Sequence, residues 1–459
     1  MCLCQSRKIV SVGNTEKYKS YTLSNYRNIR QIDRLSEEQK FAIDVVARVL
    51  PFKTNSYVVN ELIDWDNLPN DPIFILNFPQ REMLHPHHFD RMAKLLKRGA
   101  SKKEITDCAN LIRMELNPHP DGQMELNRAC LDGKTLAGLQ HKYEETVLCF
   151  PSQGQTCHAY CTFCFRWPQF IGVEKFRFAM HEAEELVQYL KVHTEVTDLL
   201  FTGGDPFMMK TKIFARYLRK LIHADLPHLK TIRIGTKALS YWPYRFIDDK
   251  DADDLLHLFD EVIAAGKHLA IMAHFNSVEE LATDTVRNAI GRIRSTGAQI
   301  RTQSPLLRHI NDKPESWIAL WEQQVNLGCI PYYMFVVRNT GNRHYFSVSL
   351  ARAWKIFRAA YSQVSGIART VRGPCMSALP GKVQVLGATQ IKDNKVFVLQ
   401  MIQGRNPEWV LRPFFAAFDD QAIWLDELRP AFDQSRFFYQ DELDMLMESS
   451  MFSEGVVSA

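Results

Sequence analysis

From about residue 145 the chain alternates short apolar runs with longer amphipathic stretches. The apolar runs are typical of buried strands and lie at Thr146–Phe150, Asp198–Phe201, Thr231–Ile234, Leu269–His274, Gln299–Thr302 and Ile330–Val337. The stretches between them have helical spacing, near residues 181–192, 211–223, 251–265, 278–296, 314–327 and 346–361. This alternation predicts an α/β fold with a parallel sheet and right-handed crossovers. Periodicity leaves open whether the sheet is a barrel or an open doubly wound sheet.

The segments on either side have a different pattern. Residues 1–140 are predicted to form a mainly helical N-terminal domain, in which Ser36 precedes an apolar-periodic run that ends at Pro51. Residues 141–390 contain the strand–helix units. Residues 391–459, rich in Phe, Trp, Pro and Asp, lack that rhythm and are predicted to form a C-terminal extension packed on the core.

Composition narrows the function classes. The 459 residues are 46% hydrophobic and 24% charged, with a net charge of +4 (56 basic minus 52 acidic), so nothing favours a nucleic-acid or anionic-membrane partner. Met1–Lys8 lacks the apolar region of a signal peptide, and Ile330–Val337 is too short to span a bilayer. We therefore expect a cytoplasmic protein whose ten cysteines are more often metal or reactive sites than disulfides.

The sharpest chemical signal is a C-x3-C-x2-C motif just after the first predicted strand. Cys157, Cys161 and Cys164 lie on one short loop, where three thiolates can hold three irons of a [4Fe–4S] cluster. The fourth iron would then be open to a small molecule, whereas a structural zinc site normally needs a fourth protein ligand. The alternatives are a zinc knuckle that recruits His158 or a distant cysteine, and three unrelated thiols.

A glycine-rich turn ends the second predicted strand. In Gly203-Gly204-Asp205-Pro206, the glycines allow close backbone approach to a ligand, and Asp205 could position an ammonium group. Alone, this sequence is a common turn. Its place one strand–helix unit after the cysteines favours a ligand site at the carboxyl ends of the strands.

These motifs resemble those of the radical S-adenosylmethionine (SAM) superfamily, including the aromatic Phe163 before the third cysteine. The resemblance implies a partial (β/α)6 barrel in which SAM chelates the open iron through its amino and carboxylate groups. One electron from the cluster would then cleave SAM to a 5′-deoxyadenosyl radical, which abstracts a substrate hydrogen. The protein would position the reacting atoms and exclude water.

From about residue 45 to 390, the chain is similar to the lysine 2,3-aminomutase family. The matching segments include Leu50-Pro51-Phe52-Lys53, Asp71-Pro72-Ile73-Phe74, Cys164-Phe165-Arg166, His274-Phe275-Asn276, Gln303-Ser304-Pro305-Leu306-Leu307-Arg308 and Pro331-Tyr332-Tyr333. The resemblance implies a second cofactor, pyridoxal 5′-phosphate (PLP), bound as an aldimine through which the amino group migrates from Cα to Cβ. Such chemistry needs a lysine for the resting Schiff base, and cations for the phosphate and the substrate carboxylate.

Individual roles carry over by position. Arg166 matches the arginine that binds the substrate carboxylate, and Lys382 matches the PLP lysine. His274 and Gln303 match positions near SAM. Asp312 matches one of two aspartates that hold the ammonium of a lysine substrate.

The chain also departs from the family pattern. Ala378-Leu379-Pro380-Gly381 replaces the glycine run before the PLP lysine, and His141-Lys142-Tyr143-Glu144-Glu145-Thr146 replaces the family's H-R-Y-P-D-R segment, which weakens the expected phosphate site. Cys375 stands where the second substrate-binding aspartate would be, so another amino acid is as good a candidate as lysine. No cysteine follows Cys375, so the zinc site that some family members carry near the C-terminus is absent.

The sequence therefore predicts a radical SAM aminomutase that contains a [4Fe–4S] cluster, SAM and PLP. It would act on an amino acid, receive electrons from a donor such as a flavodoxin or ferredoxin, and form a homo-oligomer, as the resemblance implies. The alternatives are a PLP-independent radical SAM enzyme on the same scaffold, and a non-catalytic iron–sulfur or zinc protein.

Overall fold

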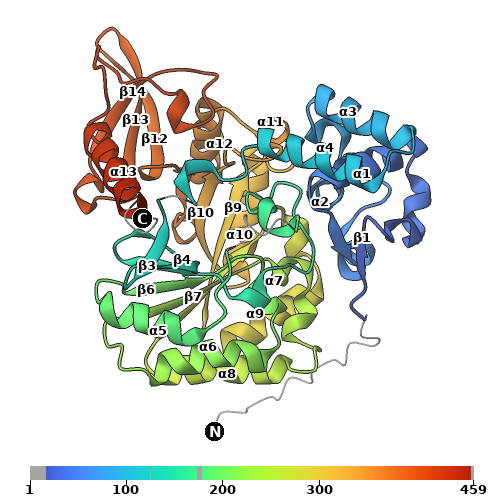
Figure 1. Ribbon diagram of the computed structural model, residues 1–459, viewed down its shortest axis with the longest axis horizontal. Coiled ribbons are helices and arrows are strands. Elements are labelled where there is room, and N and C mark those ends of the chain that lie inside the picture. Colours follow the sequence, from blue (N-terminus) through green and yellow to red (C-terminus); the bar gives the residue numbers. More distant parts are fainter. Residues whose placement is uncertain (1–16, 125, 173–177, 456–459) are drawn as a thin grey trace.

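The computed structural model describes residues 17–124, 126–172 and 178–455 (Figure 1). Met1–Lys8, in which no signal peptide is expected, lies outside the described residues. No described helix combines the length and the apolar character that a membrane crossing requires.

A 12-stranded sheet organises most of the chain, with the strand order β14-β13-β12-β11-β10-β9-β8-β7-β6-β5-β4-β3. Its centre is seven parallel strands: β5 (Thr146–Cys149), β6 (Asp198–Phe201), β7 (Thr231–Thr236), β8 (His268–His274), β9 (Gln299–Leu306), β10 (Ile330–Val336) and β11 (Arg372–Ser377). The helices that connect them are α5 (Ala183–Val192), α6 (Thr211–His223), α7 (Ala238–Tyr241), α8 (Ala252–Ala264), α9 (Asp284–Ser295), α10 (Pro314–Asn326), α11 (Arg343–Phe346) and α12 (Leu350–Gln363). The six predicted strand–helix units are thus confirmed, and the fold is α/β.

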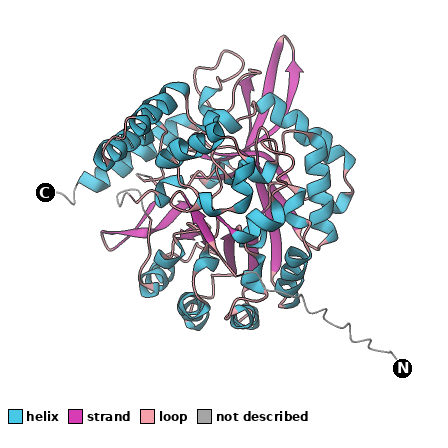
Figure 2. Cartoon of the chain, turned by 90° about the vertical axis from the view of Figure 1, so that its right-hand side faces the viewer, coloured by secondary structure: helices cyan, strands magenta, loops and turns pink. Residues whose placement is uncertain are grey.

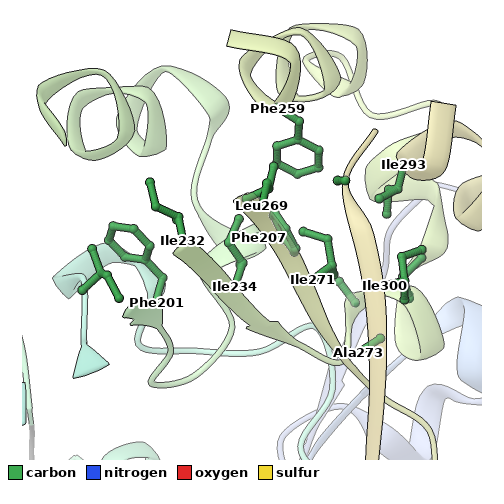
Figure 3. Close-up of a cluster of buried hydrophobic side chains, with 14 of the residues drawn as sticks. Phe201, Phe207, Ile232, Ile234, Phe259, Leu269, Ile271, Ala273, Ile293 and Ile300 are labelled. Carbon is green, nitrogen blue, oxygen red and sulfur yellow. The ribbon is translucent and has the colours of Figure 1, made fainter. Parts of the chain in front are cut away.

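One face of the central strands packs against the helices. Alternate side chains of the strands are buried in one apolar cluster with the inner faces of α8 and α9. Figure 3 shows this packing for Phe201, Phe207, Ile232, Ile234, Phe259, Leu269, Ile271, Ala273, Ile293 and Ile300. The remaining positions of each strand, which alternate with the buried ones, form the opposite face of the sheet.

The opposite face of the sheet is polar and aromatic. Alternation places Arg233, His274, Gln303, Tyr333 and Lys382 on that face. Most of these side chains are partly exposed, unlike the fully buried residues between them. The polar face is therefore where the fold can bind a small molecule.

The two margins of the sheet approach each other. Gln403 Nε2 donates to Glu145 Oε1 at 2.5 Å, and Lys142 donates to the carbonyl of Ala378. The guanidinium of Arg405 donates to Asn127 Oδ1 at 2.6 Å. The strand order shows no pairing between β3 and β14 among the described residues, so the sheet curls into an open, partial barrel.

The N-terminal segment is mainly helical and lies in front of the strands in Figure 2. It contains β1 (Ser20–Thr22), β2 (Lys53–Asn55), α1 (Glu37–Val49), α2 (Pro72–Asn77), α3 (Pro86–Lys97) and α4 (Lys102–Glu115). The predicted start of α1 is confirmed, because the Ser36 side chain accepts from the Gln39 amide in a capping box. The segment has its own apolar cluster, which also contacts residues that follow the barrel strands.

The sheet extends beyond the limits expected from the sequence. The remaining strands and the last helix are β3 (Arg128–Leu131), β4 (Lys134–Tyr143), β12 (Gly381–Ile391), β13 (Asn394–Gly404), β14 (Pro413–Ala417) and α13 (Gln440–Gly455). The expected boundary between residues 140 and 141 falls inside β4, and the one between 390 and 391 cuts the last residue from β12. Both boundaries therefore divide strands of one sheet, because β3–β4 and β12–β14 pair antiparallel with it.

Candidate active site

The cysteine loop follows β5 and is held by the N-terminal segment. Lys53 Nζ donates to the carbonyl of Cys157 at 2.7 Å, and Asn55 Nδ2 donates to the carbonyl of His158 at 3.2 Å. The amide of Thr162 donates to the carbonyl of Leu76 at 2.9 Å. These bonds fix the loop backbone at both ends, so the N-terminal segment helps to position the thiols.

The three cysteines are half-buried, and loss of solvent around the thiols raises the pKa of Cys161 to about 12 and that of Cys164 to about 11. Two groups of three described residues bring metal-ligand atoms within 4.8 Å of one another, and neither contains Cys157, Cys161 or Cys164. In a zinc knuckle the sulfurs would lie about 3.8 Å apart, given Zn–S bonds of about 2.3 Å. At least one pair of the three sulfurs is therefore more than 4.8 Å apart, farther than in a single-zinc site.

The glycine-rich turn after β6 packs directly on the cysteine loop. A Cβ at Gly204 would lie 2.4 Å from the backbone nitrogen of Thr156, and one at Gly203 would lie 2.2 Å from the Gln155 side chain. Gly203 also has a φ of +129°, which disfavours residues with a side chain. Gly204 is therefore required for the close approach of two backbone segments, and Gly203 for its positive φ.

Asp205 joins neighbouring strand ends. Its amide donates to the Thr156 carbonyl at 2.7 Å, while its carboxylate accepts from the Phe207 amide, the Thr236 hydroxyl and the Lys237 amide at 2.8–3.0 Å. The side chain is 2% exposed, and burial raises its pKa. Because its carboxylate is occupied by protein donors, Asp205 positions the turn and is not placed to bind an ammonium group directly.

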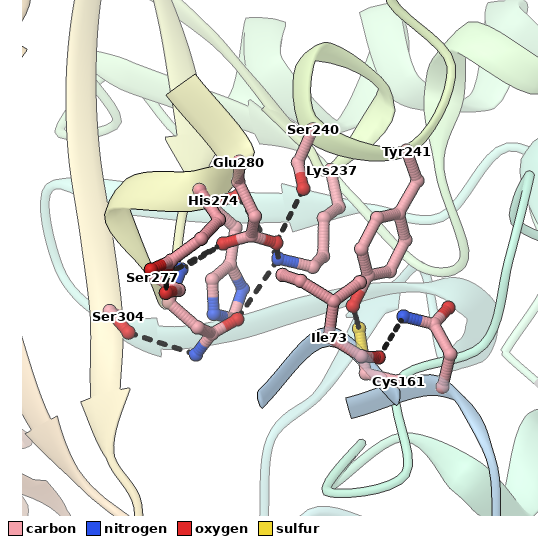
Figure 4. Close-up of polar contacts among 12 residues, drawn as sticks. Ile73, Cys161, Lys237, Ser240, Tyr241, His274, Ser277, Glu280 and Ser304 are labelled. Carbon is pink, nitrogen blue, oxygen red and sulfur yellow. Dashed lines mark hydrogen bonds and ion pairs between the residues drawn. The ribbon is translucent and has the colours of Figure 1, made fainter. Parts of the chain in front are cut away.

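A buried ionic network lies beside the cysteine loop (Figure 4). Lys237, which follows β7, donates from Nζ to Glu280 Oε1 at 2.6 Å, to Asn276 Oδ1 at 2.9 Å and to the His274 carbonyl at 3.3 Å. The same ammonium lies 4.4 Å from the ring centre of Tyr241, whose hydroxyl is 3.9 Å from Cys161 Sγ. The network connects the ends of β7 and β8 to one predicted cluster ligand.

His274 and Gln303, which both match family positions near SAM, lie side by side. They pair in register on β8 and β9, so both side chains project from the same face. The His274 ring lies 5.5 Å from that of Phe163, and its Nε2 atom is buried without a hydrogen-bond partner among the described residues. Burial lowers the pKa of His274 well below its usual value. A neutral imidazole next to the cysteine loop can accept or donate a hydrogen bond to a ligand such as SAM.

Arg166 is a half-buried cation that forms no ion pair with a carboxylate among the described residues. Its guanidinium lies over the rings of Phe150 and Phe165, at 4.6 and 4.9 Å, and its Nη1 atom has no hydrogen-bond partner in the described part of the chain. Burial lowers the pKa of Arg166 to about 9. An incoming carboxylate would satisfy both the charge and the free donor.

Lys382 lies on the polar face, at the start of β12. Its ammonium is 4.4 Å from the ring centre of Tyr333 and 5.9 Å from those of Phe335 and Tyr143, and its Nζ donates to Gln403 Oε1 at 2.7 Å. Burial lowers the pKa of Lys382 to about 7. At neutral pH about half of these amines are uncharged, which is the nucleophilic form that attacks a carbonyl.

Three further cations surround the loop that precedes Lys382. Lys142 donates to the Ala378 carbonyl, Arg405 Nε donates to the Leu379 carbonyl at 2.9 Å, and Arg338 Nη2 donates to the Ser377 carbonyl at 3.1 Å. Burial lowers the pKa of Lys142 well below its usual range, and Arg405 and Arg338 lower it further. Arg338 and Arg405 supply positive charge beside this loop, where an anionic group such as a phosphate can bind.

Asp312 and Cys375 are placed differently from each other. The Asp312 carboxylate accepts from Arg352 Nη2 of α12 at 3.3 Å, and among the described residues it makes no hydrogen bond or ion pair with Lys382. Cys375 is fully buried on β11, where burial raises its pKa to about 12 and the nearby Lys382 ammonium opposes that rise. The structure therefore brings Cys375, not Asp312, next to Lys382.

Sequence reasoning missed Lys237, Glu280, Arg338 and Arg405. Lys237 and Arg338 immediately follow strands that the sequence does predict, so their position at strand ends is a signal that could have identified them. Glu280 has a local signal as well, because it forms a capping box with Ser277, whereas Arg405 has none, because its partner Asn127 lies far away in the sequence.

Comparison with known proteins identifies the family of the chain. No protein-family model matches the chain. It is 31% identical over 402 residues to a protein of Aquifex aeolicus (strain VF5) provisionally named L-lysine 2,3-aminomutase, with 87% of this chain and 93% of that protein covered. It is 22% identical over 349 residues to the L-lysine 2,3-aminomutase of Bacillus subtilis (strain 168), with 76% and 64% covered.

Solved structures give weaker matches. A radical SAM methyltransferase from Sphaerobacter thermophilus aligns with a TM-score of 0.34 and 13% identity, covering 61% of this chain and 91% of that one. SuiB of Streptococcus suis, bound to S-adenosylmethionine, aligns with a TM-score of 0.33 and 14% identity, covering 59% and 56%. The Aquifex relative carries the assignment: the chain belongs to the radical SAM, lysine 2,3-aminomutase-like family.

Proposed function

We propose that this chain is a radical SAM aminomutase that moves the amino group of a small α-amino acid from Cα to Cβ. In this proposal Cys157, Cys161 and Cys164 hold a [4Fe–4S] cluster with SAM, and Lys382 carries PLP. The single observation that carries the PLP part is the environment of Lys382, an amine with a pKa of about 7 on an aromatic-lined face. Most lysines stay protonated far above this pH and cannot form an imine readily.

The donor set around Lys382 fits PLP. Lys142, Arg338 and Arg405 all donate to the backbone between residues 377 and 379, so three basic side chains, two of them guanidiniums, surround the segment before the lysine. The carboxylate paired with them is Asp121, which accepts from Arg338 at 2.9 Å. A phosphate would offset the excess positive charge.

The residues near the thiols fit a ligand with a carboxylate and an amine. The Nε2 atom of His274 and the Nη1 atom of Arg166 are both buried polar atoms without a partner among the described residues. When bound, SAM on the cluster supplies a radical that removes a hydrogen, and PLP supplies the carbon that holds the migrating nitrogen. The chain itself binds the substrate carboxylate at Arg166, exchanges a proton at Lys382 Nζ, and excludes water with Phe163 and Phe165.

The position of the two margins explains how both groups act on one substrate. Arg338 lies 5.0 Å from the ring centre of Phe165, which Arg166 also contacts, and it donates to Ser377, the residue that pairs with Lys382. The cysteine loop and the lysine strand are thereby linked across the polar face.

The substrate of this chain is proposed to be an amino acid other than lysine. A lysine side chain would bring a second ammonium group, but Asp312 pairs with Arg352 and the second expected carboxylate is replaced by Cys375. Burying an ammonium without a carboxylate is costly. The cations that line this face favour a neutral or acidic side chain.

The reaction requires an electron from outside the chain, and we propose a small carrier such as a flavodoxin or ferredoxin. The described cysteines are all free thiols, which supports a reducing compartment such as the cytoplasm. A homo-oligomer stays part of the proposal on family resemblance.

The test uses the full chain, reconstituted without oxygen with iron, sulfide and PLP, then reduced with borohydride and digested. Mass spectrometry is expected to find a pyridoxyl group on Lys382. The Lys382→Arg variant should lose the label, and Lys395→Arg, which changes an exposed lysine on β13, should keep it.

The outcomes separate the proposal from its alternatives. If Lys382 is unlabelled while SAM is still cleaved to 5′-deoxyadenosine, the chain is a PLP-independent radical SAM enzyme. If SAM is not cleaved by the reduced, cluster-loaded protein, the chain is a non-catalytic metal protein.

A further inference from the structure

Histidines gather where α3 begins and α4 ends. His87 and His88 lie in the first turn of α3, and Glu115 is the last residue of α4. One ligand atom from each of these three residues lies within 4.8 Å of the others. His88 Nε2 and Glu115 Oε2 are 2.7 Å apart, and the rings of His87 and His88 are 4.0 Å apart.

Two more imidazoles adjoin this group. His85 lies 5.8 Å from both His87 and His88, and its ring stacks at 3.9 Å on that of His344, which belongs to α11. Four imidazoles therefore meet from two elements that are far apart in the sequence, the start of α3 and α11. Protonated imidazoles so close together would repel one another, whereas neutral imidazoles are metal ligands.

His88 adds an independent observation. The residue is 3% exposed, and its Nδ1 atom is buried with no hydrogen-bond partner in the described part of the chain. With Nε2 bonded to the Glu115 carboxylate, the second nitrogen is an unsatisfied polar atom, which is expensive in a protein interior. A metal ion bound at either ring nitrogen would change which atoms of His88 have a partner. A carboxylate bonded to a metal-binding histidine is a common arrangement.

We propose that His87, His88 and Glu115 bind a divalent transition-metal ion, of which Zn²⁺ is the probe of choice. Two imidazole nitrogens and one carboxylate oxygen suit zinc, nickel or copper, whereas calcium and magnesium prefer oxygen alone. Around tetrahedral zinc, ligand atoms lie about 3.4 Å apart, so atoms within 4.8 Å of one another need to close by about 1.4 Å at most. Water or His85 completes the coordination.

The consequence is structural. The ion joins the start of α3 to the end of α4, and α11, which carries His344, packs through Phe346 on Phe163 of the cysteine loop at 6.1 Å. Arg91 Nη1 lies 3.5 Å from the second Glu115 oxygen, so it neutralises that oxygen while the first binds the metal. The site is formed by residues other than those of the proposed aminomutase chemistry and is independent of it.

The test is calorimetric titration of Zn²⁺ into the cluster-loaded full chain without oxygen, with iron content measured before and after. We expect one zinc per chain, no loss of iron, and an apparent melting temperature that rises with zinc. His87→Ala and Glu115→Gln each change an exposed side chain and should weaken zinc binding at least tenfold, by an order-of-magnitude expectation.

The matched control is His193→Ala, which alters the other group of three ligands, His141, His193 and Glu195. There His141 already bonds Tyr189 and the Glu144 carbonyl, and His193 already bonds Glu195, so zinc binding should be unchanged. Equal zinc affinity in the wild type and in His87→Ala would overturn the proposal, as would zinc uptake that only replaces iron.

Discussion

Replacing Gly204 by alanine should separate the cysteine loop from the turn after β6. The new Cβ would lie 2.4 Å from both the nitrogen and the oxygen of Thr156, where real Cβ atoms stay beyond 3.0 Å. The backbone must therefore move by at least 0.6 Å, the difference between these two values. Thr156 immediately precedes Cys157, so the first predicted cluster ligand moves with it.

The size of the effect follows from two contributions. Overpacking a tight contact costs about 1–3 kcal/mol. The hydrogen bond from the Asp205 amide to the Thr156 carbonyl, now 2.7 Å, would be stretched or lost, at about 1 kcal/mol. We expect the free energy of unfolding to fall by about 2–4 kcal/mol in total. A displacement of this size also exceeds the tolerance of metal–ligand distances, about 0.2 Å.

The assay is iron and sulfide content after anaerobic reconstitution, with electron paramagnetic resonance of the reduced protein and denaturant unfolding. The wild type should hold about four irons per chain, and Gly204→Ala less than half of that. Gly291→Ala is the matched control: Gly291 lies in α9 with no atom within 4 Å of a new Cβ, and alanine favours a helix by about 1 kcal/mol. It should keep all of its iron.

Full iron content in Gly204→Ala, with stability within about 0.5 kcal/mol of the wild type, would refute the reasoning. The turn would then tolerate a side chain, and its glycines could not be attributed to packing against the cysteine loop.

Three further predictions follow from the site. Labelling of Lys382 by PLP and borohydride should rise about tenfold from pH 6 to pH 8. With a pKa of about 7, the neutral amine rises from about a tenth to about nine tenths of the population over this range. Labelling that does not change with pH would contradict the buried environment of Lys382. Glu280→Gln removes the carboxylate of a buried ion pair and should lower the free energy of unfolding, measured with denaturant, by about 3–5 kcal/mol. Glu261→Gln, which changes an exposed ion pair, should lower it by less than about 1 kcal/mol. Cys161→Ser should abolish the visible absorption of the reconstituted cluster, whereas Cys130→Ser, which changes an exposed thiol, should leave it unchanged. Equal absorption spectra of the two variants would show that Cys161 is not a cluster ligand.

The central strands could be predicted because each is a short apolar run between amphipathic helices. β6 and α6, for example, have the bounds that the sequence indicates. β12 and β13 were missed, although they form an antiparallel hairpin with alternating apolar residues around a turn at Lys392, which has a φ of +51°. This two-residue periodicity predicts strands, but it differs from the strand–helix pattern of the central sheet. The extent of the sheet therefore did not follow from the strand–helix pattern.

The site residues show a different limit. The cysteine spacing is local, so the loop could be identified from the sequence alone. The direction of the Asp205 carboxylate could not be predicted from the sequence, because it depends on hydrogen bonds from Thr236 and Lys237. Strand pairing alone brings these two residues beside Asp205. The pairing of Asp312 with Arg352 is likewise a tertiary contact.

The most direct test of the central claim is amino-group migration itself. The reconstituted chain would be incubated without oxygen with SAM, PLP, a reductant and a panel of amino acids deuterated at Cβ, and the products analysed by mass spectrometry. The account predicts a β-amino acid isomer of one substrate, with deuterium also found in 5′-deoxyadenosine. Cleavage of SAM without any β-amino acid, or without deuterium in 5′-deoxyadenosine, would contradict it.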